Sequence, residues 1–201
     1  AESDRIRYLT PVLHQQMMSE LRWPEEVGDN LGIDVSTLDL DTTDLAKLGV
    51  ARRSDVMDYL ARWQGGAALG DTTRDRVNAS SAVAVLTVAG DTPTDYLRGG
   101  RALALLWTRA NQCGLAVHPV SPVFLFARDE QDRAGLSAEF TDELTDLQAR
   151  FAATVGLPAA EAPVLVVRVS HDVAPAARSR RLSDAAVLLA STPPTEGEQL
   201  R

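Results

Sequence analysis

Residues 92–114, TPTDYLRGGRALALLWTRANQCG, form the most completely specified helix in the sequence. Thr92 is suited to be the N-cap, Pro93 suits the first helical position, and Asp95 completes a capping box three residues after the cap. Gly114 is suited to end the helix in the left-handed conformation. The sequence therefore predicts a helix that fills the whole stretch between Thr92 and Gly114.

This helix is predicted to be central and buried, because residues 102–107 are apolar on nearly every side. The apolar run at residues 81–88 precedes it and predicts a strand covered on both faces. Short strands are predicted at 115–118 and 123–126, on either side of a turn at 118–122. A last strand is predicted at 163–169.

The remaining helices are predicted from apolar residues at helical spacing. They cover residues 4–21, 54–63 and 137–155, with a short helix near Leu45 and a loop at 70–78. In the first of them Pro11 is a residue that can bend the helix or delay its start. The polar residues 191–201 are predicted to be a disordered tail. Together these elements predict one domain over residues 1–190.

The composition excludes several classes of protein. The formal net charge of −8 argues against a nucleic-acid-binding protein, which needs a basic face. No apolar run reaches the roughly 20 residues that span a bilayer, so we expect no membrane partner and a cytoplasmic location. Cys113 is the single cysteine, which excludes an intrachain disulfide, and its place in the predicted buried helix indicates a structural thiol. The three histidines are scattered, and we expect no metal site.

Residues 89–190 resemble the second half of a flavin-dependent nitroreductase. In that family a long central helix ends in Ala-x-x-x-Gly-Leu, as residues 110–115 do here. A turn follows, here Pro-Val-Ser-Pro at 119–122, and a last strand at 163–169 leads to the Arg-rich residues 178–182. The resemblance implies an α+β fold, a three-layer α-β-α sandwich with a mainly antiparallel sheet and a long central helix, that binds FMN.

Two short motifs extend the resemblance to a subgroup. Residues 19–23, Ser-Glu-Leu-Arg-Trp, and the pair Arg180-Arg181 are similar to recurring motifs of the actinobacterial Acg-type proteins and of nitroreductase-like domains fused to ThiF-type adenylating domains. In the Acg type, two nitroreductase-like halves form a pseudo-dimer around FMN. The family's early Arg-rich segment and its Pro-Ser-x-x-Asn-x-Gln-Pro-Trp stretch are both missing here. The resemblance therefore implies a homodimer, or a missing N-terminal half that completes the site.

The resemblance also indicates which residues would hold the flavin. Arg178, Arg180 and Arg181 are expected to bind the FMN phosphate, with a solvated basic run as the alternative. The backbone of Val120 and Ser121 is expected to face the flavin ring, with the Ser121 N–H donating to N5. The alternative for this turn is a tight connection shaped by its two prolines, and Pro122 has no N–H to donate. No catalytic residue is assigned.

Other candidates favour a structural role. We expect Trp63 and Trp107 to pack in the core, since both lie on the apolar stripes of their helices. His118, beside the turn, is expected to be a polar residue at a strand end rather than a sensor of flavin charge.

Three functions are compatible with this interpretation. The first is an FMN-dependent oxidoreductase that passes hydride from NAD(P)H to nitro-aromatics or quinones. The second is an FMN storage or sequestration protein without turnover. The third is a flavin-free dimerisation or regulatory domain fused to a ThiF-type adenylating enzyme.

Overall fold

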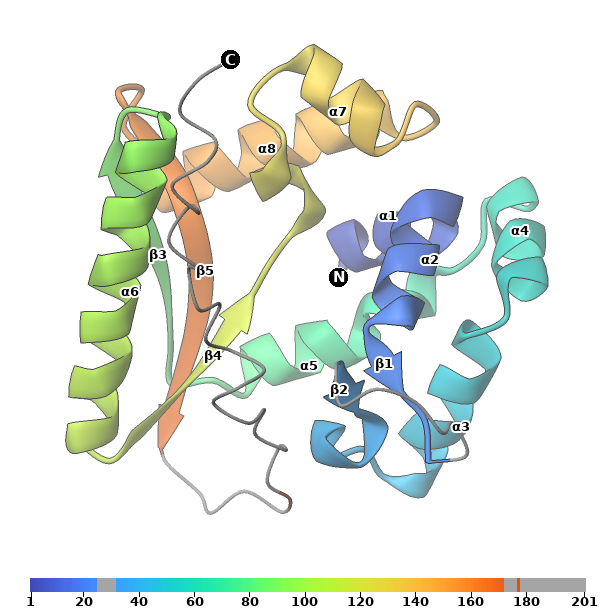
Figure 1. The fold of residues 1–201 in the computed structure, drawn as a ribbon. Helices are drawn as coiled ribbons and strands as arrows, with labels where there is room; N and C mark the ends of the chain where they lie inside the picture. The colour runs from blue at the N-terminus through green and yellow to red at the C-terminus, as the bar shows by residue number, and fades with distance from the viewer. Residues whose placement is uncertain (25–31, 172–176, 178–201) are drawn as a thin grey trace, which may run out of the picture.

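The computed structural model describes residues 1–24, 32–171 and 177. The chain folds into a mixed α+β structure in which α6 (Pro93–Gln112) covers one side of a small antiparallel sheet and the other helices lie on its other side (Figure 1). The predicted α+β class is therefore confirmed. The predicted tail at 191–201 and the Arg-rich segment at 178–182 lie outside the described residues.

The chain begins with two helices, α1 (Glu2–Leu9) and α2 (Pro11–Ser19), where one helix over residues 4–21 was predicted. The break falls at Thr10, whose backbone is extended with φ −93° and ψ 114°. Pro11 causes it, because proline disfavours the helical conformation of the residue before it and then starts a new helix at the first position.

Short elements follow in the described residues between 21 and 78. They are β1 (Leu21–Arg22), β2 (Ile33–Asp34), a 3₁₀ turn at Val35–Leu38, α3 (Thr42–Ala51), α4 (Ser54–Arg62), a 3₁₀ turn at Ala67–Gly70 and α5 (Asp71–Asn78). The strands β1 and β2 pair in parallel. The loop predicted at 70–78 is wrong, because α5 occupies most of it. This helix buries none of its residues, so it has no apolar stripe for a sequence pattern to detect.

The larger sheet has three strands in the order β3-β5-β4, all antiparallel to their neighbours. They are β3 (Ala82–Ala89), β4 (Leu115–Val120) and β5 (Glu161–His171). The prediction that the strand at 81–88 is covered on both faces is wrong, since none of the residues of β3 is buried and the side chain of Val83 is exposed. The strand predicted at 123–126 is also wrong, because Val123–Phe126 forms a 3₁₀ turn directly after Pro122.

The long helix α6 (Pro93–Gln112) has the predicted bounds and the predicted capping box between Thr92 and Asp95. It packs on one face of the sheet through Gly99, where a Cβ atom would lie 2.7 Å from Cγ2 of Val164. The prediction of a buried central helix is wrong, because Leu97 and Leu105 are each 72% exposed. Within the described chain only the sheet side of α6 is covered (Figure 1).

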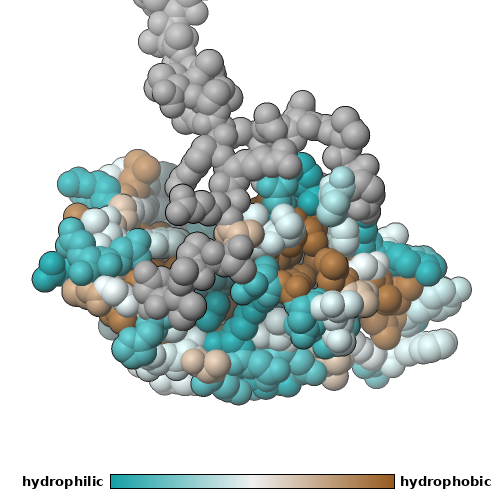
Figure 2. Space-filling model, turned by 90° about the horizontal axis from the view of Figure 1, so that it is seen from below, coloured by the Kyte–Doolittle hydropathy of each residue, from teal (hydrophilic) through white to brown (hydrophobic). Residues whose placement is uncertain are grey.

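Two further predictions of burial, for Cys113 and Trp63, are also wrong. Cys113 at the end of α6 is exposed, so it is not a buried structural thiol. Trp63 at the end of α4 is 78% exposed, while Trp107 on α6 is half-buried. Apolar side chains also reach the surface elsewhere, including Ile33, Leu45 and Val50. On the face seen in Figure 2, hydrophobic patches alternate with hydrophilic residues.

The main core lies where α1 and α8 (Thr141–Val155) meet the 3₁₀ turn at 123–126. Its buried residues are Ile6, Val123, Phe124, Leu144 and Leu147. The helix predicted at 137–155 is thus confirmed, although it begins four residues later, and α7 (Glu130–Leu136) before it was not predicted. No described helix is both long and apolar enough to cross a bilayer.

Candidate functional site

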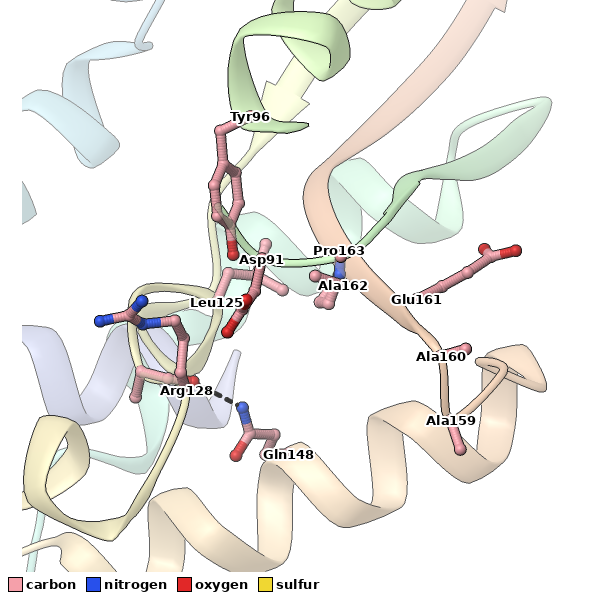
Figure 3. Close-up of a pocket in the computed structure, with 12 residues that line it drawn as sticks. Asp91, Tyr96, Leu125, Arg128, Gln148, Ala159, Ala160, Glu161, Ala162 and Pro163 are labelled. Carbon is pink, nitrogen blue, oxygen red and sulfur yellow. Dashed lines mark hydrogen bonds between the residues drawn. The ribbon is translucent and has the colours of Figure 1, made fainter. Parts of the chain in front are cut away.

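A cleft opens at the N-terminal end of α6, between the start of β5 and the segment that follows the 3₁₀ turn at 123–126 (Figure 3). Asp91, Tyr96, Leu125 and Arg128 line it, and its volume is about 360 Å³. An adjoining hollow of about 350 Å³ shares these four residues and extends to Ser121, Phe126 and Val164. We call the two hollows together the α6 cleft. Its size is within the range of small-molecule sites.

The first turn of α6 positions Tyr96 on the wall of the cleft. The carboxylate of Asp95 accepts hydrogen bonds from the Thr92 hydroxyl at 2.5 Å and the Thr92 backbone N–H at 3.2 Å. These bonds lower the pKa of Asp95 below its usual value, with the hydroxyl bond as the largest cause. Gly90 turns the chain into the helix with φ +91°, and a Cβ atom there would lie 2.6 Å from Oδ2 of Asp95. The capping box therefore fixes the helix start against the cleft.

The opposite wall is held by Gln148 of α8. Its side-chain amide donates to the carbonyl oxygens of Ala127 at 2.8 Å and Phe124 at 3.3 Å. Arg128 follows, and its backbone N–H and Nε both donate to Asp132, at 3.0 and 3.4 Å. The backbone N–H of Arg128 is the largest cause of the lowered pKa of Asp132. The mostly exposed guanidinium of Arg128 is thus held at the edge of the cleft (Figure 3).

The turn after β4 is held by two side chains of α1. Nη2 of Arg7 donates to the Ser121 carbonyl oxygen at 2.7 Å, and the Val123 N–H donates to Oγ of Ser3 at 2.6 Å. Ser121 lines the α6 cleft. Val120 is the last residue of β4, pairs with Val166, and is not among the lining residues.

The structure therefore brings one predicted site residue into a cavity. Arg178, Arg180 and Arg181 lie outside the described residues. Sequence reasoning missed Tyr96 and Arg128 as lining residues, and it missed Arg7 and Ser3 as supports of the turn. The supports had no local signal, because they contact the turn across more than 110 residues of chain.

The chemical character of the cleft is apolar and aromatic with a few polar groups. Tyr96, Leu125 and Phe126 provide a surface on which a planar ring could pack, and Arg128 provides a cation. Asp91 adds a carboxylate to the lining, while the side chain of Glu161 points away from Asp91 and Tyr96 (Figure 3). Oε2 of Glu161 instead accepts a hydrogen bond from Thr87 at 2.5 Å. This arrangement is suited to binding a flat, partly polar molecule.

The chain is similar to an uncharacterized protein of Mycobacterium tuberculosis (strain CDC 1551 / Oshkosh). The two are 48% identical over 181 residues, which cover 90% of this chain and 25% of the relative. The chain therefore spans about a quarter of the length of that relative. No family model and no solved structure matches the chain.

Proposed function

We propose that this chain forms part of an FMN-binding oxidoreductase of the nitroreductase type, which uses NAD(P)H to reduce nitro-aromatics or quinones. The observation that carries the proposal is the position of Ser121. The turn that resembles the flavin-facing turn of the family lies on the wall of a cleft whose other walls include Tyr96, Leu125 and Phe126. A cofactor ring needs such apolar cover together with a donor at its polar edge.

The residues present fit the ring of FMN better than they fit its phosphate. Tyr96, Leu125 and Phe126 would pack on the ring, and the Ser121 N–H would donate to its polar edge. Bound FMN would supply the hydride transfer. Arg128 is the cation that lines the cleft, but it is shared with Asp132. The proposal therefore keeps Arg178, Arg180 and Arg181 as the phosphate ligands.

The proposal includes a second nitroreductase-like half, from a second copy of the chain or from elsewhere in a longer protein. Leu97 and Phe126 are exposed near the cleft, and Leu105 is exposed farther along α6. Apolar surface of this kind marks sites that another surface covers. The 25% coverage of the relative leaves ample chain in that protein for such a half.

The test is to titrate FMN into the full-length protein and to follow flavin fluorescence. Tyr96→Ala removes an aromatic side chain from the wall and should weaken FMN binding about 5- to 150-fold, since aromatic stacking is worth about 1–3 kcal/mol. Tyr59→Ala is the matched control, because Tyr59 is exposed on α4, away from the cleft, and this variant should bind FMN normally. NAD(P)H should bleach the flavin spectrum. A full-length protein that binds no flavin would reject the proposal.

The same exposed face of α6 favours a second candidate, a flavin-free dimerisation or regulatory domain of a larger enzyme, such as one with a ThiF-type adenylating domain. This candidate requires the α6 face to be covered in the full-length protein and the cleft to bind no flavin. FMN storage is distinguished by a third result, in which FMN binds but NAD(P)H does not bleach it.

A further inference from the structure

Three basic side chains come together on the sheet face opposite α6. His118 of β4 and Arg168 of β5 are direct partners in the strand register, so their side chains lie next to each other on one face. Arg76 of α5 is close enough to act electrostatically on both. Helix α5 and helix α6 lie on opposite sides of the sheet (Figure 1). We call Arg76, His118 and Arg168 the basic cluster.

The charges of the basic cluster are not balanced by acidic side chains in the described part of the chain. Neither Arg76 nor Arg168 takes part in any of the ion pairs found there, whereas Arg5 pairs with Glu143 and Arg22 with Asp34. Nε of Arg168 is buried and has no hydrogen-bond partner. Nη2 of Arg76 reaches the Leu38 carbonyl oxygen only at 3.4 Å. A buried donor without an acceptor costs free energy, and an added acceptor would recover it.

The pKa changes in the basic cluster indicate which charge a ligand there would need. Desolvation, and then the charges of Arg168 and Arg76, lower the pKa of His118 below its usual value, and only a hydrogen bond at the Pro119 backbone opposes them. Desolvation, and then Arg76, lower the pKa of Arg168. No acidic group contributes to either change within the described residues. The two guanidinium groups repel each other and disfavour the protonated form of His118, and an anion among the three side chains would relieve both effects.

We propose that Arg76, His118 and Arg168 bind a dianionic oxyanion of the phosphate type. Guanidinium groups match phosphate oxygens in geometry and form charge-assisted hydrogen bonds with them, and a protonated histidine adds a third donor. None of the three residues lines the α6 cleft. The anion site is therefore separate from the proposed flavin-ring site, and its existence does not depend on flavin binding.

Histidine NMR tests the proposal directly. The chain has three histidines, and loss of a signal in His118→Gln assigns the one in the cluster. Inorganic phosphate, added to the full-length protein at constant ionic strength, should raise the pKa of His118 to at least its ordinary value of about 6.5, because the anion stabilises the imidazolium. Chloride at the same ionic strength should leave it lowered. A His118 pKa that phosphate does not move would overturn the proposal.

Three variants separate a binding site from a general charge effect. Arg76→Gln and Arg168→Gln should each weaken the phosphate response of His118 at least about tenfold, as expected for the loss of one charge-assisted bond. Arg76 lies on a helix that buries no residue, so its replacement keeps the test valid if Arg168→Gln fails to fold. Arg101→Gln is the control, since Arg101 is exposed on α6 on the other side of the sheet. A response unchanged in Arg76→Gln would contradict the assignment.

A second titration identifies the form in which the anion arrives. Glycerol 3-phosphate carries the same phosphate dianion on an organic group. Tighter binding than that of inorganic phosphate would assign the site to a phosphate monoester, and weaker binding would assign it to free phosphate. Failure of both compounds to move the pKa of His118 would reject the site altogether.

Discussion

Helices α6 and α8 are the two longest in the described chain, and they are used in opposite ways. Both end at a glycine in the left-handed conformation, Gly114 with φ +70° and Gly156 with φ +62°. Yet α8 buries Leu144 completely and Leu147 almost completely, while α6 leaves Leu97 and Leu105 largely in solvent. The helix with the better sequence signals is thus the one that contributes less to the core. Apolar residues determine that a helix face can be buried, but not which part of the molecule buries it.

The two helices differ in exposure because they pack against different elements of the structure. Helix α8 lies against α1, α7 and the 3₁₀ turn at 123–126. Among the described elements, helix α6 packs mainly on the three-stranded sheet. Its outer face is therefore the surface on which the proposed second half would pack. Matched substitutions in the two helices test this comparison.

The largest effect is expected from placing a charge in each helix. Leu144→Asp puts a carboxylate into the core and should cost at least about 3–5 kcal/mol, enough to abolish cooperative unfolding in a marginally stable domain. Leu105→Asp should change the free energy of unfolding by less than about 0.5 kcal/mol, as at other surface sites. Urea denaturation followed by circular dichroism measures both. If Leu105→Asp destabilises a dimer or the full-length protein, the outer face of α6 is covered in that assembly.

The two adjacent glycines of α6 sharpen the comparison within one helix. Gly99→Ala forces a Cβ atom against Val164 and should destabilise the fold by about 1–3 kcal/mol. Gly100→Ala meets no atom within 4 Å, and should stabilise the helix by up to about 1 kcal/mol. Thermal unfolding of the two variants should therefore shift in opposite directions. Shifts in the same direction would mean that α6 does not sit on the sheet through Gly99.

A smaller effect is expected where the two helices begin. Helix α6 starts with a capping box at Thr92, whereas α8 starts at Phe140 without a side-chain cap. Thr92→Ala should cost about 1 kcal/mol. Amide hydrogen exchange should then accelerate in the first turn of α6 and remain unchanged in α8. Equal acceleration in both helices would indicate global destabilisation and not the loss of a cap.

The smallest effect concerns His118, which lies on the sheet face opposite α6. Because the pKa of His118 is lowered in the folded protein, the unfolded chain binds a proton more readily. His118 therefore favours folding fully above its unfolded pKa of about 6.5, and this contribution is lost as the pH falls toward its folded pKa. His118→Gln should reduce the loss of stability between about pH 7 and pH 5 by a small amount. His171→Gln serves as the control, and an identical pH dependence in both variants would contradict this role for His118.

The sequence predicted local features well and tertiary ones poorly. The bounds of α6 followed from Thr92 and Gly114, and the stripe of α8 followed from Leu144 and Leu147, because caps and periodicity are properties of neighbouring residues. The exposure of Leu105 depends on what lies across from it, which no local pattern contains. Helix α5 has no apolar stripe at all and was missed.

The candidate site shows the same limit. Ser121 could be selected from its turn, and it does line the α6 cleft. Tyr96 and Arg128 line the cleft from segments 32 residues apart, so their meeting depends on tertiary packing and not on a local pattern. The basic cluster likewise combines a helix with two strands, and neither Arg76 nor Arg168 belongs to a motif.

The two outer strands of the sheet differ in a way that affects how the isolated chain behaves in solution. Strand β3 contains only Ala, Val, Leu and Thr, whereas β4 carries Pro119, which has no N–H to offer a neighbouring strand. Charged residues and prolines are the usual protection against edge-to-edge pairing, and β3 has neither. We therefore expect samples to form β-rich aggregates with rising concentration and temperature, in spite of a net charge of −8. Shelf life and crystallisation should depend more on the sequence of β3 than on the rest of the surface.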